Sequence, residues 1–149
     1  MGNPILEVCV ILYLSFEELS ALRSSIEHVL EADARAGYVI AAPPQVIADL
    51  EQLAPSLIGD ISIATLDHHA RTRAAIAHLV QDARARMDAV VVDQHPSSEY
   101  AVAGYFEYAY LLGVLHRLDA MRDEMAALVQ IVTGDDPDSE AARRFSFPD

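Results

Sequence analysis

The sequence contains no lysine, because all ten of its basic residues are arginines. No side chain can therefore form a Schiff base, act as a lysine general base or fill the lysine position of a phosphate-binding P-loop. An alanine- and arginine-rich composition, as in a GC-rich genome, explains this absence. Selection against lysine-directed modification is the alternative explanation.

Cysteine is almost absent too, with Cys9 as its single occurrence. One thiol excludes an internal disulfide framework, a CxxC redox motif and a cysteine-rich zinc site. The apolar residues 5–14 are interrupted by Glu7 and follow no basic residue, which is not the pattern of a secretory signal. The apolar residues 101–115 are too few to span a bilayer. We therefore expect a soluble, cytoplasmic protein that does not enter membranes.

Positive charge is scarce relative to negative charge. The chain has 23 acidic residues and a formal net charge of -13. Nucleic acids and acidic membranes are bound by clustered positive charge, and the densest arginine group, in residues 71–86, is diluted by aspartates. We expect no nucleic-acid partner. The acidity indicates solubility, or alternatively a surface for a basic protein partner.

Residues 97–132 are the most informative segment of the sequence, and they predict one long helix. In residues 101–115 the only charge is Glu107, which is typical of a helix buried on all sides. Beyond this point apolar residues recur at alternating steps of three and four, the pattern of a helix packed on a partner helix in the same chain or in another copy. This pattern makes six residues candidates for an interface: Leu111, Val114, Leu118, Met121, Met125 and Leu128.

A second helix begins with a capping box, in which Ser15 is followed three residues later by Glu18. This helix should end at Gly37. Apolar or β-branched runs predict strands at residues 5–14, 38–42 and 89–92, whereas residues 61–66 fit either a strand or the start of a helix.

The alternation of strands and helices predicts an α/β fold, with a three- or four-stranded, mostly parallel sheet, packed helices and a long C-terminal helix. An all-α bundle is the alternative, because short apolar runs do not separate buried strands from buried helices. Residues 1–134 should form one globular domain. Residues 135–149 contain five acids and two prolines, so we expect a mobile tail there.

Two Asp-x-His groups follow predicted strands, namely Asp67 with His69 and Asp93 with His95. The carboxyl ends of parallel strands would bring both groups to one edge of the sheet. Two carboxylates and two imidazoles suit zinc or manganese, and either metal can activate water. In this alternative the protein is a small metal-dependent hydrolase.

The triplet of Asp67, His68 and His69 after an apolar run resembles the motif of the DHH phosphoesterases. The resemblance covers these three residues. That family also has an earlier aspartate-rich strand end and a longer chain, whereas Ser15 and Phe16 stand at the corresponding place here. The family's function is therefore not transferred, and Asp67 equally fits the N-cap of a helix.

Glu107 lies among tyrosines in the apolar half of the long helix, with Tyr105 and Tyr108 nearby. These three residues are candidates for a ligand pocket with aromatic walls and one acid at its base. The alternative is a core carboxylate whose charge is satisfied by a tyrosine or an arginine.

Strong catalytic templates are missing from the sequence. It has no GxSxG nucleophile motif and no glycine-rich phosphate loop. Together with the acidity and the long helix, this predicts a non-catalytic interaction or regulatory protein that self-associates through its C-terminal helix. We expect no cofactor, with zinc or manganese only in the hydrolase alternative.

Overall fold

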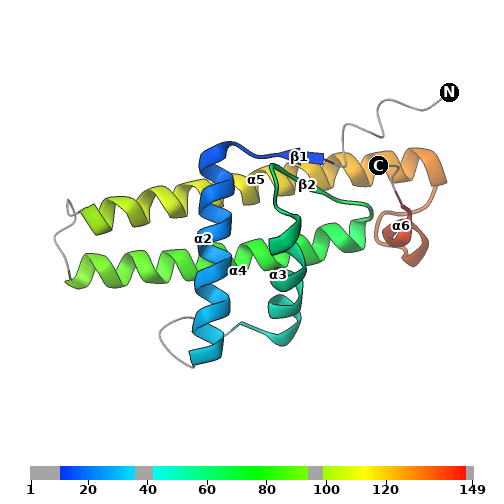
Figure 1. The fold of residues 1–149 in the computed structure, drawn as a ribbon. Helices are drawn as coiled ribbons and strands as arrows, with labels where there is room; N and C mark the ends of the chain where they lie inside the picture. The colour runs from blue at the N-terminus through cyan, green and yellow to red at the C-terminus, as the bar shows by residue number, and fades with distance from the viewer. Residues whose placement is uncertain (1–10, 36–41, 94–98, 147–149) are drawn as a thin grey trace.

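The computed structural model describes residues 11–35, 42–93 and 99–146, and most of these residues are helical (Figure 1). Two long helices lie side by side and antiparallel, and a third helix crosses them. In chain order the elements are β1 (Ile11–Tyr13), α2 (Phe16–Arg35), α3 (Pro44–Ser56), β2 (Asp60–Ser62), α4 (Leu66–Asp93), α5 (Glu99–Thr133) and α6 (Glu140–Arg144).

The predicted three- or four-stranded parallel sheet is wrong, and the all-α alternative fits better. The described residues contain one sheet, in which β1 and β2 pair antiparallel with Leu12 opposite Ile61. Residues 89–92 are not a strand because α4 continues through them to Asp93. The preference of β-branched residues for strands depends on their surroundings, so it does not by itself make residues 89–92 a strand. No proline interrupts α4, so the helix can continue through them. The predicted strand residues 5–10 and 38–41 lie outside the described part of the chain.

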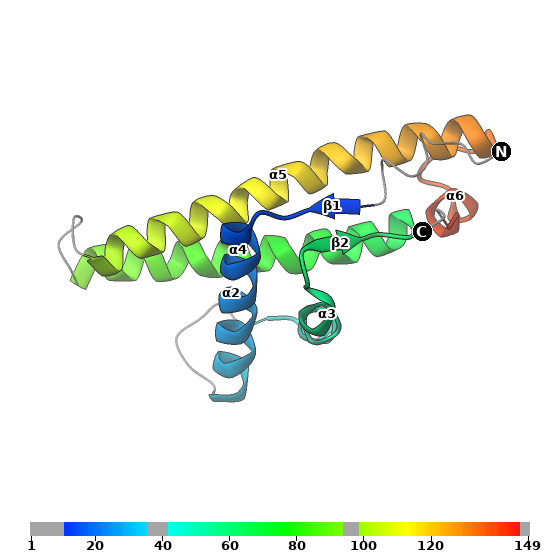
Figure 2. The same cartoon turned by 45° about the horizontal axis from the view of Figure 1, so that its top comes forward.

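The core lies where α2, α3 and the two strands pack on the α4–α5 pair (Figure 2). Along α2 the apolar side chains of Leu22, Ile26 and Val29 form a buried stripe. Leu12 and Ile61 face the same core from the paired strands. None of the helices in the described ranges is long and apolar enough to cross a membrane.

The capping box at the start of α2 is confirmed. The Ser15 backbone N–H donates to Glu18 Oε1 at 2.8 Å, and the Glu18 N–H donates to Ser15 Oγ at 3.1 Å. Arg117 of α5 donates to both Glu18 oxygens and to the carbonyl of Tyr13. Burial raises the pKa of Glu18, but the hydrogen bonds from Ser15 and Arg117 together hold it below its usual value. The cap thus fixes β1 and the start of α2 to α5.

The segment after Gly134 returns to the body of the molecule. Gly134 ends α5 with a φ of 74°, and its N–H donates to the carbonyl of Gln130 at 2.8 Å. Within residues 135–149, expected to form a mobile tail, α6 packs its buried Ala142 against the core. The charged groups of Arg143 and Asp67 lie 3.9 Å apart and connect α6 to the first turn of α4.

Candidate functional site

A shallow groove of about 350 Å³ separates the start of α2 from the first half of α5. Its main feature is a pair of exposed phenylalanines, since Phe16 is 80% exposed and Phe106 is 59% exposed. Exposed aromatic surface of this kind is typical of interaction sites when it forms a patch. The groove is lined by Phe16, Glu17, Ser20, Ala21, Ser24, Ala103, Phe106, Glu107 and Tyr110.

The local sequence explains why these aromatic rings line the groove. The capping box starts α2 at Phe16, so this ring stands in the first turn of the helix. On α5, Phe106 and Tyr110 are four residues apart and therefore lie on the same face. Their rings stack with centroids 6.4 Å apart and an angle of 25° between the planes. Val102 and Tyr105, on neighbouring positions of α5, are also exposed.

An ion-pair network joins the groove to the interior of the α4–α5 pair. Arg86 donates from Nη1 and Nη2 to the two oxygens of Glu107, each at 3.1 Å, and from Nε to Asp82 at 2.9 Å. Burial lowers the pKa of Arg86, but Glu107 and Asp82 raise it by more, so the guanidinium stays charged. An arginine partner for Glu107 was one of the alternatives predicted from the sequence, and it is the one observed.

The three residues predicted to form an aromatic ligand pocket do not share one cavity. Glu107 lines the groove, but Tyr105 and Tyr108 are not part of its lining. The Tyr108 ring instead lies beside Arg84, whose Cζ is 5.8 Å from the ring centroid. Tyr110 takes the place at the groove that the prediction gave to these two tyrosines.

The six side chains predicted to form an interface are buried within a single chain. None of them is more than 9% exposed, and Leu118 and Met125 have no exposed surface. They belong to the same core as Leu79 of α4. The heptad pattern therefore closes on a helix of the same chain, and an interface through these six residues would require α4 and α5 to separate. The six are Leu111, Val114, Leu118, Met121, Met125 and Leu128.

Within the described residues, the predicted metal ligands do not converge. Asp67 and Asp93 lie at opposite ends of α4, which at the rise of an α-helix separates them by about 39 Å. His95 lies outside the described residues. The prediction depended on residues 89–92 forming a separate strand, and the continuous helix removes that condition. Within the described ranges no group of three or more histidine, cysteine or acidic side chains is placed to hold a metal ion.

His69 connects α4 to α5. It is 1% exposed, and its Nε2 lies 2.6 Å from the carbonyl oxygen of Leu118. Because a carbonyl only accepts, the ring nitrogen donates, and this nitrogen is not available to a metal. Burial lowers the pKa of His69 despite the bond to Leu118 and the neighbouring Asp119, so the ring is neutral at pH 7.

The lowered pKa of His69 makes the free energy of unfolding depend on pH. A histidine whose folded pKa lies below its unfolded pKa stabilises the fold above the unfolded value, near 6.5, and this contribution is lost as the pH falls through the folded pKa. We therefore expect His69→Gln, which keeps an N–H donor but does not titrate, to weaken the loss of stability between pH 7 and pH 5. Urea unfolding of both proteins across this range measures how the free energy of unfolding changes with pH. Equal slopes for the two proteins would contradict a lowered pKa of His69.

Sequence reasoning missed the two phenylalanines that dominate the groove. The signal was present, because Phe16 follows the capping serine directly and Phe106 stands in the apolar half of the long helix. The sequence did not show which side of α5 is covered by the rest of the chain. The chain matches no family model, no curated protein and no solved structure.

Proposed function

We propose that this protein is a non-catalytic interaction protein that self-associates through the exposed aromatic surface of α2 and α5. The observation that carries the proposal is the exposure of Phe16 and Phe106 on opposite walls of one groove. Aromatic side chains are the commonest anchors of protein interfaces, because they bury a large apolar area with few rotatable bonds.

The composition of α5 supports coverage of this surface by another chain. In residues 101–115 the only charge is Glu107, and a helix without a polar face is normally buried all round. In the single chain, however, Val102, Tyr105, Phe106 and Ala109 are exposed. The α4–α5 pair extends beyond α2 at this end (Figure 1), so among the described elements only α4 lies along this part of α5.

Charge favours a second copy over a basic partner. The surface has few carboxylates available for a cation: Glu107 is paired with Arg86, and Glu18 is paired with Arg117. Glu17 is the one carboxylate of the groove lining without an arginine partner among the described residues. A weakly charged apolar patch is self-complementary, and in a two-fold dimer each copy offers the same patch to the other. Since one cysteine needs no oxidising compartment, we place this dimer in the cytoplasm.

The test is the mass of the protein in solution after a charge is placed in the patch. We expect the unmodified protein to be a dimer and Phe106→Asp to be a folded monomer of 16.3 kDa. An exposed phenylalanine carries little of the stability of the monomer, so the circular dichroism and the melting temperature should change little. Light scattering coupled to size exclusion, over a range of concentrations, measures the mass.

Ile58 provides a matched control, because it is 82% exposed but lies in the turn between α3 and β2, away from the groove. Ile58→Asp adds the same charge at an equally exposed apolar position and should leave the dimer intact. A monomeric unmodified protein at every concentration would overturn the proposal. So would a Phe106→Asp variant that remains a dimer.

A further inference from the structure

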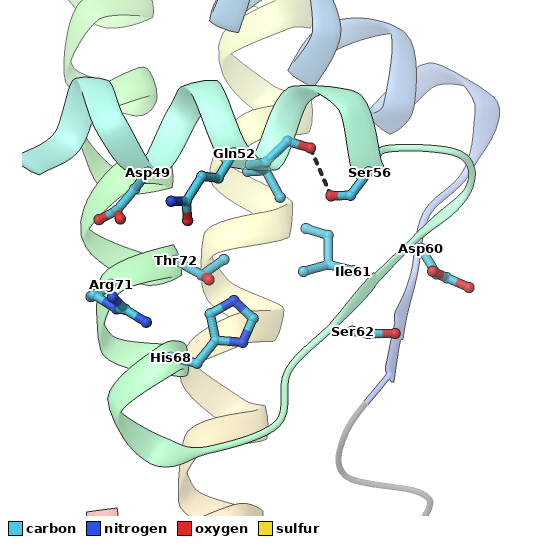
Figure 3. Close-up of a pocket in the computed structure, with 10 residues that line it drawn as sticks. Asp49, Gln52, Ser56, Asp60, Ile61, Ser62, His68, Arg71 and Thr72 are labelled. Carbon is cyan, nitrogen blue, oxygen red and sulfur yellow. Dashed lines mark hydrogen bonds between the residues drawn. The ribbon is translucent and has the colours of Figure 1, made fainter. Parts of the chain in front are cut away.

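A second cavity, of about 370 Å³, lies between α3, β2 and the first turns of α4 (Figure 3). Its volume is in the range of sites for small molecules. Most of its lining residues are polar, and Leu53 and Ile61 add apolar contributions. The polar residues of the lining are Asp49, Gln52, Ser56, Asp60, Ser62, His68, Arg71 and Thr72.

His68 presents a single hydrogen-bond donor to this cavity. Its backbone N–H donates to Thr65 Oγ1 at 2.9 Å, which fixes the residue in the first turn of α4. Its Nδ1 accepts from the N–H of Ala64 at 3.4 Å, so the ring proton is on Nε2. Burial and the nearby Arg71 lower the pKa of His68 in spite of Asp49, and the ring is therefore neutral at pH 7.

Asp49 and Arg71 place opposite charges at one end of the cavity. Figure 3 shows both side chains at this end, with His68 beside Arg71. Both charges act on His68, yet the two groups do not form an ion pair with each other. Asp49 instead accepts a hydrogen bond from Gln45 Nε2 at 3.0 Å. Among the described residues no carboxylate pairs with Arg71, so its guanidinium is available to a ligand.

We infer that this cavity binds a small zwitterion of the amino-acid type. The carboxylate of the ligand would lie between the guanidinium of Arg71 and the Nε2–H of His68, and its ammonium group would face Asp49. Charged donors and acceptors of this kind give the strongest hydrogen bonds in a protein site. The amide of Gln52, on the wall opposite His68, can bind a polar group of the ligand's side chain.

The pairing of charges selects against simpler ions. A carboxylate without an ammonium group would meet Arg71 but would also be repelled by Asp49. An amine without a carboxylate would be repelled by Arg71 in the same way. A ligand that carries both charges satisfies both residues. An isolated arginine or an isolated aspartate would not distinguish such a ligand from a singly charged ion.

The test is a screen of the common L-amino acids against the full chain by thermal shift, at millimolar concentration, followed by calorimetric titration of the best ligand. Acetate and methylamine, at the same concentration, are the singly charged comparisons. We expect at least one amino acid to raise the melting temperature, with little effect from either comparison. A response to no amino acid, or an equal response to acetate, would overturn the inference.

Two substitutions link the binding to the two charges. Arg71→Gln and Asp49→Asn remove one charge each while keeping similar shapes, and each should raise the dissociation constant about 10- to 100-fold. Arg144→Gln is the control, because Arg144 is a surface arginine of α6 outside the cavity. Circular dichroism confirms that each variant is folded. Unchanged affinity in folded Arg71→Gln would refute the assignment.

Discussion

Replacing Leu118 by Asp is expected to unfold the protein rather than to separate subunits. Leu118 is completely buried in the middle of α5, and its backbone carbonyl accepts the hydrogen bond from His69. An unpaired carboxylate in this position costs several kcal/mol, in addition to the lost apolar contacts. A domain of this size has a total stability of about 5–15 kcal/mol, so the variant should retain little native structure.

The control for this experiment is Ala120→Asp, two residues further along the same helix on its exposed side. This change costs about 0.7 kcal/mol at most through helix propensity, and the variant should unfold at nearly the temperature of the original protein. Circular dichroism, thermal unfolding and solution mass distinguish the outcomes. A folded, monomeric Leu118→Asp variant would show instead that the heptad pattern of α5 is closed by another copy.

A milder substitution at the same position gives a measurable free energy. Leu118→Ala should remain folded but lose about 2–5 kcal/mol of stability in urea unfolding, the cost of a large aliphatic side chain and of the cavity left behind. Phe106→Ala, at an exposed position of the same helix, should lose much less. The contrast between these variants separates the core face of α5 from its exposed face.

Helices α2 and α5 were predictable from the sequence because their signals are local. Ser15 and Glu18 define the start of α2 by contacts within one turn, and both predicted hydrogen bonds are present. The long helix was expected at residues 97–132 and is found at Glu99–Thr133. Helix periodicity and capping depend on residues three or four apart, so these elements require no knowledge of the rest of the chain.

The sheet was not predictable, because strand pairing depends on distant segments. Residues 89–92 have the β-branched composition of a strand, yet they continue α4 to Asp93. The composition of these four residues does not decide between a strand and the end of a helix. The predicted metal site required a second strand at residues 89–92, and the continuous α4 instead places Asp67 and Asp93 at opposite ends of one helix.

The candidate sites show where local reasoning ends. The composition around Glu107 correctly indicated a carboxylate that needs a partner, and the partner is Arg86. The sequence did not show that Phe16 would lie across a groove from Phe106, or that Asp49 and Arg71 would line the same cavity. Each pair joins two helices whose relative position is set by the core as a whole, so the three-dimensional arrangement was needed to find both sites.

Arg86→Met is expected to destabilise the protein by about 3–5 kcal/mol, because it leaves buried Asp82 without its counter-charge. Asp82 has no exposed surface, and its second oxygen, Oδ1, has no hydrogen-bond partner among the described residues. Glu107 is 19% exposed and can reach water after the change, so most of the cost arises at Asp82. The melting temperature should fall by about 6–20 °C.

Arg84→Met is the matched control, since Arg84 lies on the same helix and pairs with Asp88 at the surface. Loss of an exposed pair of this kind should change the melting temperature little, because water already screens the two charges. The decisive variant is the double substitution of Asp82→Leu with Arg86→Met, which removes the buried charge together with its partner. Because an apolar pair can replace a buried ion pair without loss, the double variant should recover most of the stability lost in Arg86→Met. Urea unfolding measures the double variant and the single variants Asp82→Leu and Arg86→Met. If the losses of the two single variants simply add in the double variant, Asp82 and Arg86 do not stabilise each other.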